Sequence, residues 1–409
     1  MNFRALLAGS GCNAFGFFGE QVVVGFGVYA LTASSFWVGA SLALYFAPMF
    51  FFGLASGAIA DWTSDRRVLI RRTELALAAS AAGFSLGIAV LSPSVAALLA
   101  LSVVTGVGLA MHQTLRGAIA FDLSGAERIV RRLGWLNLAA RIGQLAGAAA
   151  AGWVTRESGA AGGLVLIAAV HLCGAGAYGW FRGLSRRVRA GPGLRGQFAE
   201  LVAELRANHA LAWLVALTAG VEILGFSFVT ALPELARQRF GLGAEGLGAL
   251  HAARAAGAIA AAACLASVSR LRGGWVPYLL IVGVFAVALV GLANAEHLLF
   301  ALVALAGIAA LAVGTDVLSQ SMMQLAVSDR LRGRAMGAWV FAIGAAPLGH
   351  LELGWAINRF GLQTALSIHG LLLGALALGG GFAVGRLPLP ASPGLQGPVA
   401  RVDNDCGSE

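Results

Sequence analysis

Residues 57–67 read GAIADWTSDRR, and this charged stretch joins two long apolar runs at residues 36–60 and 68–91. A helix needs about 20 apolar residues to cross the hydrocarbon core of a bilayer, so each run is long enough to span it. Helices are the expected element, because backbone groups in lipid must form hydrogen bonds within their own segment. The stretch is therefore predicted to be a short turn at the membrane surface between two transmembrane helices.

The composition of the whole chain indicates a membrane protein. Of its 409 residues, 58% are hydrophobic and 11% are charged, whereas a soluble domain carries roughly 25% charged residues. The 57 glycines lie inside the apolar runs, where small residues allow helices to approach closely. Lipid is therefore expected to surround this chain, and the lipid bilayer is its expected partner.

Continuous apolar runs recur along the chain and predict an all-α polytopic membrane protein with twelve transmembrane helices. A β-barrel would need alternating strands of about ten residues instead. The twelve predicted spans are residues 5–31, 36–60, 68–91, 95–115, 134–154, 160–181, 209–231, 246–268, 275–293, 297–318, 335–356 and 362–385.

The basic residues give the expected orientation. All 28 of them are arginine, and 22 lie in the termini and the loops on one side of the predicted bundle, against four in the opposite loops. Basic residues are enriched in cytoplasmic loops, so both termini are expected in the cytoplasm and the protein in the inner (plasma) membrane. This distribution also explains the net charge of +9 without nucleic-acid binding.

The longest internal connection, residues 182–208, is basic and polar and divides the spans into two sets of six. The expected organisation is an N-terminal six-helix bundle (1–181), a cytoplasmic linker (182–208), a C-terminal six-helix bundle (209–385) and a disordered cytoplasmic tail (386–409). Gln113 and Asp122 in the first half recur as Gln320 and Asp329 in the second. Together with the division into two sets of six, this recurrence favours parallel repeats, a common plan of transporters.

Two loops carry a family resemblance. Gly57, Asp61, Arg66 and Arg67 resemble the signature loop of the major facilitator superfamily, and Asp329, Arg332, Gly333 and Arg334 form a loop in the second half of the chain. The second loop, with Gly19-Glu20 in the first span, is similar to the enterobactin-exporter-like efflux branch. The resemblance implies two six-helix bundles related by a pseudo-two-fold axis and transport by alternating access. It also implies that Asp61 acts at a cytoplasmic gate.

The same resemblance implies that spans one, four, seven and ten line a central cavity. Ionisable groups are rare inside membranes and are usually functional, and all six deep charged residues fall on the cavity helices or on the helices beside them. The outer helices are expected to carry only His171 and His369 at depth. The candidate residues for the cavity or for proton coupling are Glu20, Arg141, Glu222, Arg254, Asp316, Gln320, Asn137 and Gln144, with Glu352 as a weaker sixth charge.

Four acids against two arginines would leave the cavity with two uncompensated negative charges, which favours binding of protons or of a cationic or amphipathic solute. Glu20 is expected to be the main proton switch, with Arg141 as its counter-charge and Asp316 as the next candidate. Burial away from water disfavours the charged form of a carboxyl group, so such a group can alternate between proton and solute. The alternative is that these residues form permanent ion pairs needed only for folding.

The sequence gives no support for an enzymatic function. It contains no Walker loop, no nucleophile elbow and no metal-binding spacing among its four cysteines, so no cofactor or metal is expected. The expected function is a proton-coupled exporter of a hydrophobic or amphipathic small molecule, such as a drug-like compound or siderophore, working as a monomer. The alternatives are a solute importer or lipid-handling transporter on the same fold, and a non-transporting membrane sensor or partner protein.

The arginine distribution makes a prediction about topology. Cysteines introduced at Ser34 and Gly159 should react with a membrane-impermeant maleimide added to intact cells. Cysteines at Ser64 and Ser185 should react only after the membrane has been opened, because their loops belong to the arginine-rich side. The reverse labelling pattern would show that the orientation is wrong.

Overall fold

A computed structural model describes residues 2–62, 65–91, 93–180, 203, 205–267, 274–327 and 332–384, and these residues are almost entirely helical. The side chains of these residues are also described, except for those of residues 50–62, 121, 124–131, 133, 266–267, 324 and 332–337. The helices of the first half are α1 (Asn2–Thr32), α2 (Ser35–Trp62), α3 (Arg66–Leu91) and α4 (Val95–Gly179).

The helices of the second half begin with a span that changes its helical type along its length. This half consists of α6 (His209–Leu224), η1 (Phe226–Ala231), α7 (Leu232–Glu234), η2 (Leu235–Arg239), α8 (Ala244–Ser267), α9 (Trp275–Ala293), α10 (Leu298–Leu325), α11 (Arg332–Ile343), α12 (Ala346–Phe360) and α13 (Leu362–Val384).

α4 is one helical stretch of 85 residues that crosses the bundle three times. An α-helix rises 1.5 Å per residue, so a straight helix of this length would be several times longer than a bilayer is thick. The chain turns back after residue 120 and again at Gly159, whose positive φ of 69° suits a glycine. The predicted spans four, five and six are therefore all parts of α4.

The expected all-α polytopic fold is confirmed. Ten helical segments of the described residues are long and apolar enough to cross a membrane. One of them, Gly134–Gly179 with 46 residues, holds two crossings, and α2 supplies one more. The described part of the chain therefore makes the twelve crossings that the apolar runs predict.

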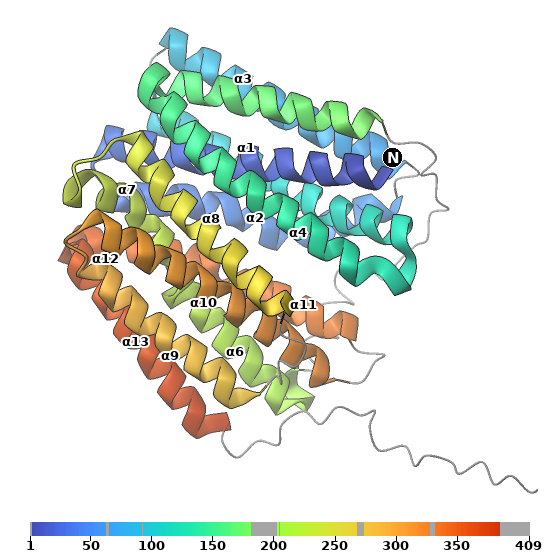
Figure 1. The fold of residues 1–409 in the computed structure, drawn as a ribbon, viewed down its shortest axis with the longest axis vertical. Helices are drawn as coiled ribbons and strands as arrows, with labels where there is room; N and C mark the ends of the chain where they lie inside the picture. The colour runs from blue at the N-terminus through green and yellow to red at the C-terminus, as the bar shows by residue number, and fades with distance from the viewer. Residues whose placement is uncertain are drawn as a thin grey trace, which may run out of the picture.

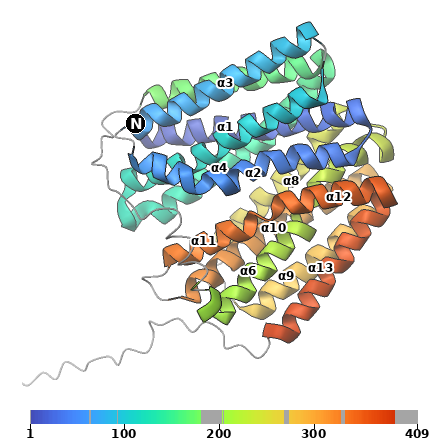
Figure 2. The ribbon, with the colours of Figure 1, turned by 180° about the vertical axis from the view of Figure 1, so that it is seen from behind.

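The helices form two groups that lie side by side (Figures 1 and 2). We call α1–α4 the first helix group and α6–α13 the second helix group. The N-terminus of α1 and the C-terminus of α13 lie at the same end of the bundle, here called the proximal end. The turns at residues 32–35, 239–244, 293–298 and 360–362 lie at the opposite, distal end.

Two spans of the second helix group are broken, and each has a proline at a change of helical type. Pro233 in α7 and Pro347 in α12 have no N–H to donate to the helix, and the helical type changes just before each of them. The predicted span 209–231 therefore continues through η1, α7 and η2 to Arg239. The predicted span 335–356 divides into α11 and α12.

Glycines form the seams between the two helix groups near the distal end. A Cβ atom on Gly152 of α4 would lie 2.8 Å from Ala244 O and 3.0 Å from Gly248 Cα. On the other seam, a Cβ atom on Gly354 of α12 would lie 2.6 Å from Ser35 O. Both seams therefore bring backbone against backbone, a close approach that small residues permit.

Polar contacts close the same end of the bundle. Ser35 N–H donates to Asn358 Oδ1 over 3.0 Å, and Asn358 Nδ2 donates to Ser34 Oγ over 2.6 Å. Gln238 Nε2 donates to Tyr29 Oη over 2.5 Å, and Ser35 Oγ donates to Glu234. Since each contact joins the first helix group to the second, the distal end is closed in this structure.

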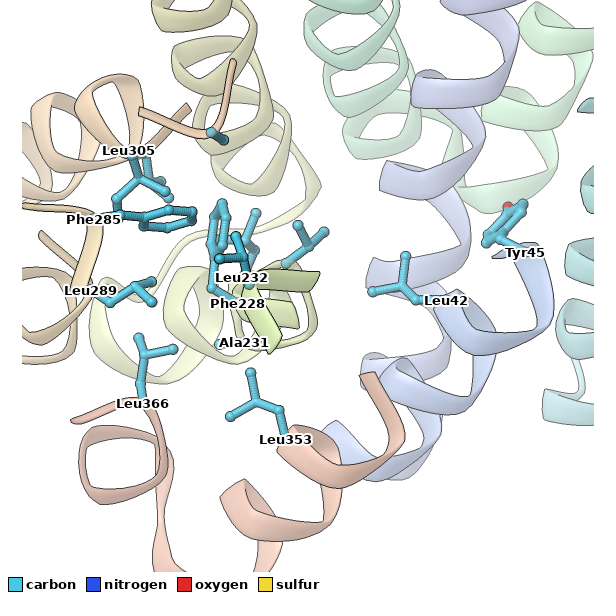
Figure 3. Close-up of a cluster of buried hydrophobic side chains, with 14 of the residues drawn as sticks. Leu42, Tyr45, Phe228, Ala231, Leu232, Phe285, Leu289, Leu305, Leu353 and Leu366 are labelled. Carbon is cyan, nitrogen blue, oxygen red and sulfur yellow. The ribbon is translucent and has the colours of Figure 1, made fainter. Parts of the chain in front are cut away.

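The hydrophobic core is continuous through the distal part of the bundle. Figure 3 shows Phe228 and Leu232 of the broken span among Phe285, Leu289 and other buried residues of the second helix group. Phe228 is 2% exposed and Phe285 and Leu289 are fully buried. The irregular backbone of η1 and α7 is therefore enclosed by protein, as irregular backbone inside a membrane must be.

The glycine seam makes a prediction about the distal end. Replacing Gly152 by Leu should hold the distal end open, because overpacking a tight interface costs about 1–3 kcal/mol and the opposing atoms are backbone. Spin labels on cysteines at Ser94 and Glu296, in a background without the native cysteines, should give a longer distance by pulsed electron paramagnetic resonance. The matched control is Gly176→Leu, because a Cβ atom at Gly176 meets nothing within 4 Å. Equal distances in both variants would contradict the role of the seam.

Candidate functional site

The central feature of the candidate site is a cavity of about 310 Å³ between the two helix groups. Its lining comes from α1, α2, the first two crossings of α4, α6, η1, α8, α10, α11 and α12, together with Gly344. No described residue of α3, α9, α13 or the last crossing of α4 contributes. The lining residues of α1, from Ser10 to Gln21, and Asp316 of α10 lie toward the proximal ends of these helices. The cavity therefore extends from the middle of the bundle toward the proximal end.

Aromatic side chains form much of the cavity wall. Phe17 and Phe18 of α1 pack edge to face with ring centroids 5.1 Å apart, and both line the cavity with Phe46, Phe226 and Trp339. Aromatic rings provide large apolar surfaces with little conformational freedom to lose. The wall is therefore suited to the apolar part of a small molecule.

His350 of α12 connects the two helix groups at the cavity wall. Its ring stacks on Phe46 of α2 with centroids 5.6 Å apart and planes 11° apart, and its Nδ1 lies 2.9 Å from Thr230 Oγ1. Sequence reasoning missed this residue, since a histidine within an apolar run carries no signal that separates packing from function.

Charged side chains of both signs line the cavity. Glu222 of α6 and Asp316 of α10 interact electrostatically with each other. Arg254 of α8 lies over the Phe228 ring at 5.3 Å and donates to His251 Nδ1 over 3.0 Å. Arg116 of α4, which sequence reasoning also missed, completes the set and donates to Asn137 Oδ1 over 3.3 Å. Two acids and two arginines therefore share one cavity.

Arg141 lies just outside the cavity lining. Its Nη1 donates to Gln144 Oε1 over 3.0 Å, and its charge interacts with Asp316 across the two helix groups without a direct ion pair. Arg254 of the second helix group lies close enough to repel Arg141. Arg141 therefore interacts electrostatically with charges of both signs on the second helix group.

The expected pairing of Glu20 with Arg141 is wrong. Glu20 Oε1 accepts hydrogen bonds from Tyr45 Oη and Thr105 Oγ1, both over 2.7 Å. Glu20 is 2% exposed. It lies on the side of α1 that faces α2 and the first crossing of α4, within the first helix group. Arg141 lies on the second crossing of α4 and meets the second helix group instead.

The expected excess of two negative charges in the cavity is wrong for the same reason. Glu20 does not line the cavity, and Glu352 lies half-exposed on α12, with its Oε2 2.5 Å from His369 Nε2. Arg116 adds a positive charge that was not among the residues expected in the cavity. The acids and arginines that line the cavity are therefore equal in number.

The remaining candidates divide between the cavity and its surroundings. Glu222, Arg254 and Asp316 line the cavity, whereas Gln144, Asn137 and Gln320 do not. Asn137 binds Arg116 and Gln144 binds Arg141, so these two polar residues hold one arginine in the cavity wall and one beside it. Gln320 follows Asp316 by one helical turn.

The signature loops are described only in part. Arg66 forms an ion pair with Asp122 at 2.8 Å, and Arg67 forms one with Asp65 at 3.4 Å. Gly57 and Asp61 lie in α2, and Arg332, Gly333 and Arg334 lie in α11, but their side chains are outside the described residues. Asp329 is outside them entirely. The gate role of Asp61 stays a prediction.

A buried acid on α3 was missed and contradicts the expected distribution of charge. Glu74 on α3 is fully buried, although α3 was expected to carry no charge at depth. It contacts Asn13, His112 and His171. The signal was obscured because Glu74 closely follows Arg71 and Arg72, near the N-terminal end of the predicted span 68–91.

The comparisons with known proteins agree with this architecture. A family model described as Major Facilitator Superfamily matches residues 6–349. A comparison with curated protein sequences found no match.

Solved structures share the fold at low sequence identity. A crystal structure of a peptide transporter, POT, in complex with sulfate has a TM-score of 0.75 at 13% identity and covers 94% of each chain. A D-xylose-proton symporter has a TM-score of 0.69 at 15% identity, covering 95% of this chain and 98% of its own. A bacterial homolog of the human lysosomal transporter Spinster, inward-facing and unoccupied, has a TM-score of 0.69 at 16% identity and covers 94% and 96%.

The charge arrangement predicts opposite effects for the two cavity acids. Glu222→Gln should raise the thermal unfolding midpoint of the detergent-solubilised protein, because it removes repulsion from Asp316. Asp316→Asn relieves the same repulsion but should lower the midpoint, because the lost attraction between Asp316 and Arg141 outweighs that relief. Two unit charges several ångströms apart at a partly buried site interact by roughly 2 kcal/mol, so scanning fluorimetry should resolve both shifts. Midpoint shifts of the same sign would contradict this assignment.

Proposed function

This chain belongs to the Major Facilitator Superfamily, and we propose that it is a proton-coupled exporter of a hydrophobic or amphipathic small molecule. It is a transporter rather than an enzyme, and it works by alternating access between the two helix groups. The observation that carries the proposal is the cavity between the groups, where aromatic walls surround charges of both signs.

The cavity supports an amphipathic solute. Its volume of about 310 Å³ falls at the lower end of the range of small-molecule sites, which is roughly 300–1,000 Å³. Phe17, Phe18 and Trp339 offer apolar contact, and Glu222 with Arg254 offers a charged partner for either sign. Drug-like compounds and siderophores combine these two properties.

The acidic pair Glu222 and Asp316 is the proposed proton switch, in place of Glu20. Two nearby carboxylates repel when both are charged, so binding one proton between them relieves the repulsion. Asp316 also attracts Arg141 of the first helix group. A proton or a cationic solute that neutralises Asp316 weakens this attraction, and a ligand that interacts differently with two states shifts their populations.

The distribution of arginine supports the proposed orientation in the membrane. With the arginine-rich side in the cytoplasm, the proximal end faces the cytoplasm, the distal end faces outward and the protein lies in the plasma membrane. The cavity extends toward the proximal end while Asn358 and Gln238 close the distal end. An exporter takes up its solute in this state, and an importer releases its solute in it.

Import of a zwitterionic solute is the second candidate. The cavity carries both acids and arginines, which matches a solute with both charges, and similar folds include a peptide transporter and a D-xylose-proton symporter. Export and import differ in the direction of the proton gradient that drives solute uptake into vesicles, so one experiment separates them.

The experiment uses the purified protein in liposomes and ethidium, a permanently cationic amphipathic dye. Under proton antiport, ethidium should accumulate when the lumen is more acidic than the medium, and a protonophore should abolish the accumulation. Asp316→Asn and Glu222→Gln should each reduce the proton-driven rate by at least about tenfold, which corresponds to about 1.4 kcal/mol in the barrier. The matched control is Glu157→Gln, because Glu157 is an exposed acid paired with Arg156 at 3.6 Å.

The outcomes separate the candidates. Accumulation of dialanine when the medium is the more acidic side would favour import by symport. Ethidium accumulation that ignores the proton gradient, or variants with wild-type dependence on it, would overturn proton coupling through the acidic pair.

A further inference from the structure

A second group of titratable side chains lies inside the first helix group. Glu74 of α3 is fully buried, and its Oε1 accepts a hydrogen bond from Asn13 Nδ2 over 2.8 Å. Its Oε2 lies 2.8 Å from His171 Nδ1, and its Oε1 lies 3.5 Å from His112 Nε2. These contacts join α1, α3 and two crossings of α4 around one carboxyl group.

Glu74 occupies a core position of α3. Ile70, Leu77, Ala78 and Ala81 lie on the same buried face with the spacing of one helix side. A charge there is expensive, and ionisable groups inside membranes mark proton relays and solute pathways. Among the described residues, Glu74 forms ion pairs only with histidines, so its counter-charge depends on protons.

Each histidine has one ring nitrogen in the cluster and one without a partner. His171 Nδ1 meets Glu74, while its Nε2 has no hydrogen-bond partner among the described residues. His112 Nε2 lies 2.9 Å from Tyr178 Oη, and its Nδ1 is likewise unpaired. An imidazole in this arrangement can gain a proton without breaking its existing contact.

The position of His171 depends on a glycine. Its ring packs against α1 so closely that a Cβ atom on Gly16 would lie 2.7 Å from His171 Cε1. Any larger residue would displace the ring from Glu74. Glycine in this helix position therefore holds a titratable group in contact with the carboxyl group.

The cluster is connected to the central cavity. Asn13 and His112 belong to the cavity wall, so the edge of the cluster borders the cavity. On the other side, the charge of His171 acts on Glu20. The other titratable groups that face the cluster are Cys12 and Glu20 from α1 and Arg116, Cys173 and Tyr178 from α4.

We propose that Glu74, His112 and His171 form a proton-binding site separate from the acidic pair in the cavity, and that His112 exchanges its proton with cavity water. Only N–H and O–H bonds form and break, and the proton comes from water and returns to it. Because both histidines contact the same carboxyl group, a proton bound by one of these groups changes the interactions of the other two. The role of the site in coupling rests on the proposed function, but its existence does not.

Infrared difference spectroscopy tests the site without any transported solute. The protein in lipid is compared between acidic and neutral pH. The wild type should show a buried carboxyl C=O band and histidine ring bands that change together. Glu74→Gln should remove that carboxyl band and alter the histidine changes, whereas the exposed control Glu157→Gln should leave both unchanged. A Glu74→Gln spectrum identical to wild type would overturn the proposal.

Hydrogen–deuterium exchange tests the connection through His112. After transfer to deuterated buffer, the Glu74 carboxyl band should exchange at least about tenfold more slowly in His112→Phe, a change of about 1.4 kcal/mol in the barrier. An unchanged exchange rate would overturn the role of His112. If Glu74→Gln does not fold, His171→Gln replaces it, and an unshifted carboxyl band in that variant would overturn the site.

The two proposals fail in different ways. A normal Glu74 signal in a protein whose ethidium transport ignores protons would overturn the proposed function and leave the site in place. Proton-driven transport by a protein whose Glu74 band does not respond to pH would overturn the site and leave the function in place.

Discussion

The polar groups of this molecule are arranged by the absence of water in the hydrocarbon. Backbone groups in lipid must form hydrogen bonds within their own segment, which gives helices, and every side-chain charge must find a partner inside the bundle or face a cavity. The buried acids follow this constraint. Glu222 and Asp316 face the cavity, and Glu20 and Glu74 are enclosed by hydroxyl, amide and imidazole groups.

The two helix groups use their charges differently. The second group holds its acids at the interface, where Asp316 attracts Arg141 of the first group, so any change in their charge acts on the relative position of the groups. The first group holds Glu74 and its histidines internally, where a change in charge acts on the packing of α1, α3 and α4. Asn13 and His112 bring these two arrangements into contact at the cavity wall.

The sequence was sufficient for the fold because length and apolarity are local properties. Each crossing could be read from its own residues, and Asp316, Glu222 and Arg254 were found because they interrupt apolar runs on cavity helices. The rotation of a helix about its axis depends on the helices that pack against it. The direction in which Glu20 points, and therefore its partners, could not be predicted from the sequence. Glu74 was missed because the membrane boundary near Arg72 is uncertain by several residues, and one turn separates a loop acid from a buried one.

Glycine at the distal seams has a consequence for the thermodynamics of alternation. Where Gly152 meets Gly248, no side chain is ordered when the seam closes, so closure there avoids the loss of rotamer freedom that burying a long side chain costs, up to about 2 kcal/mol. The hydrogen bonds made by Asn358 and Gln238 contribute only about 0.5–1.5 kcal/mol each. Closed and open distal ends can therefore differ little in free energy, and their balance can be reversed by one proton or one bound solute.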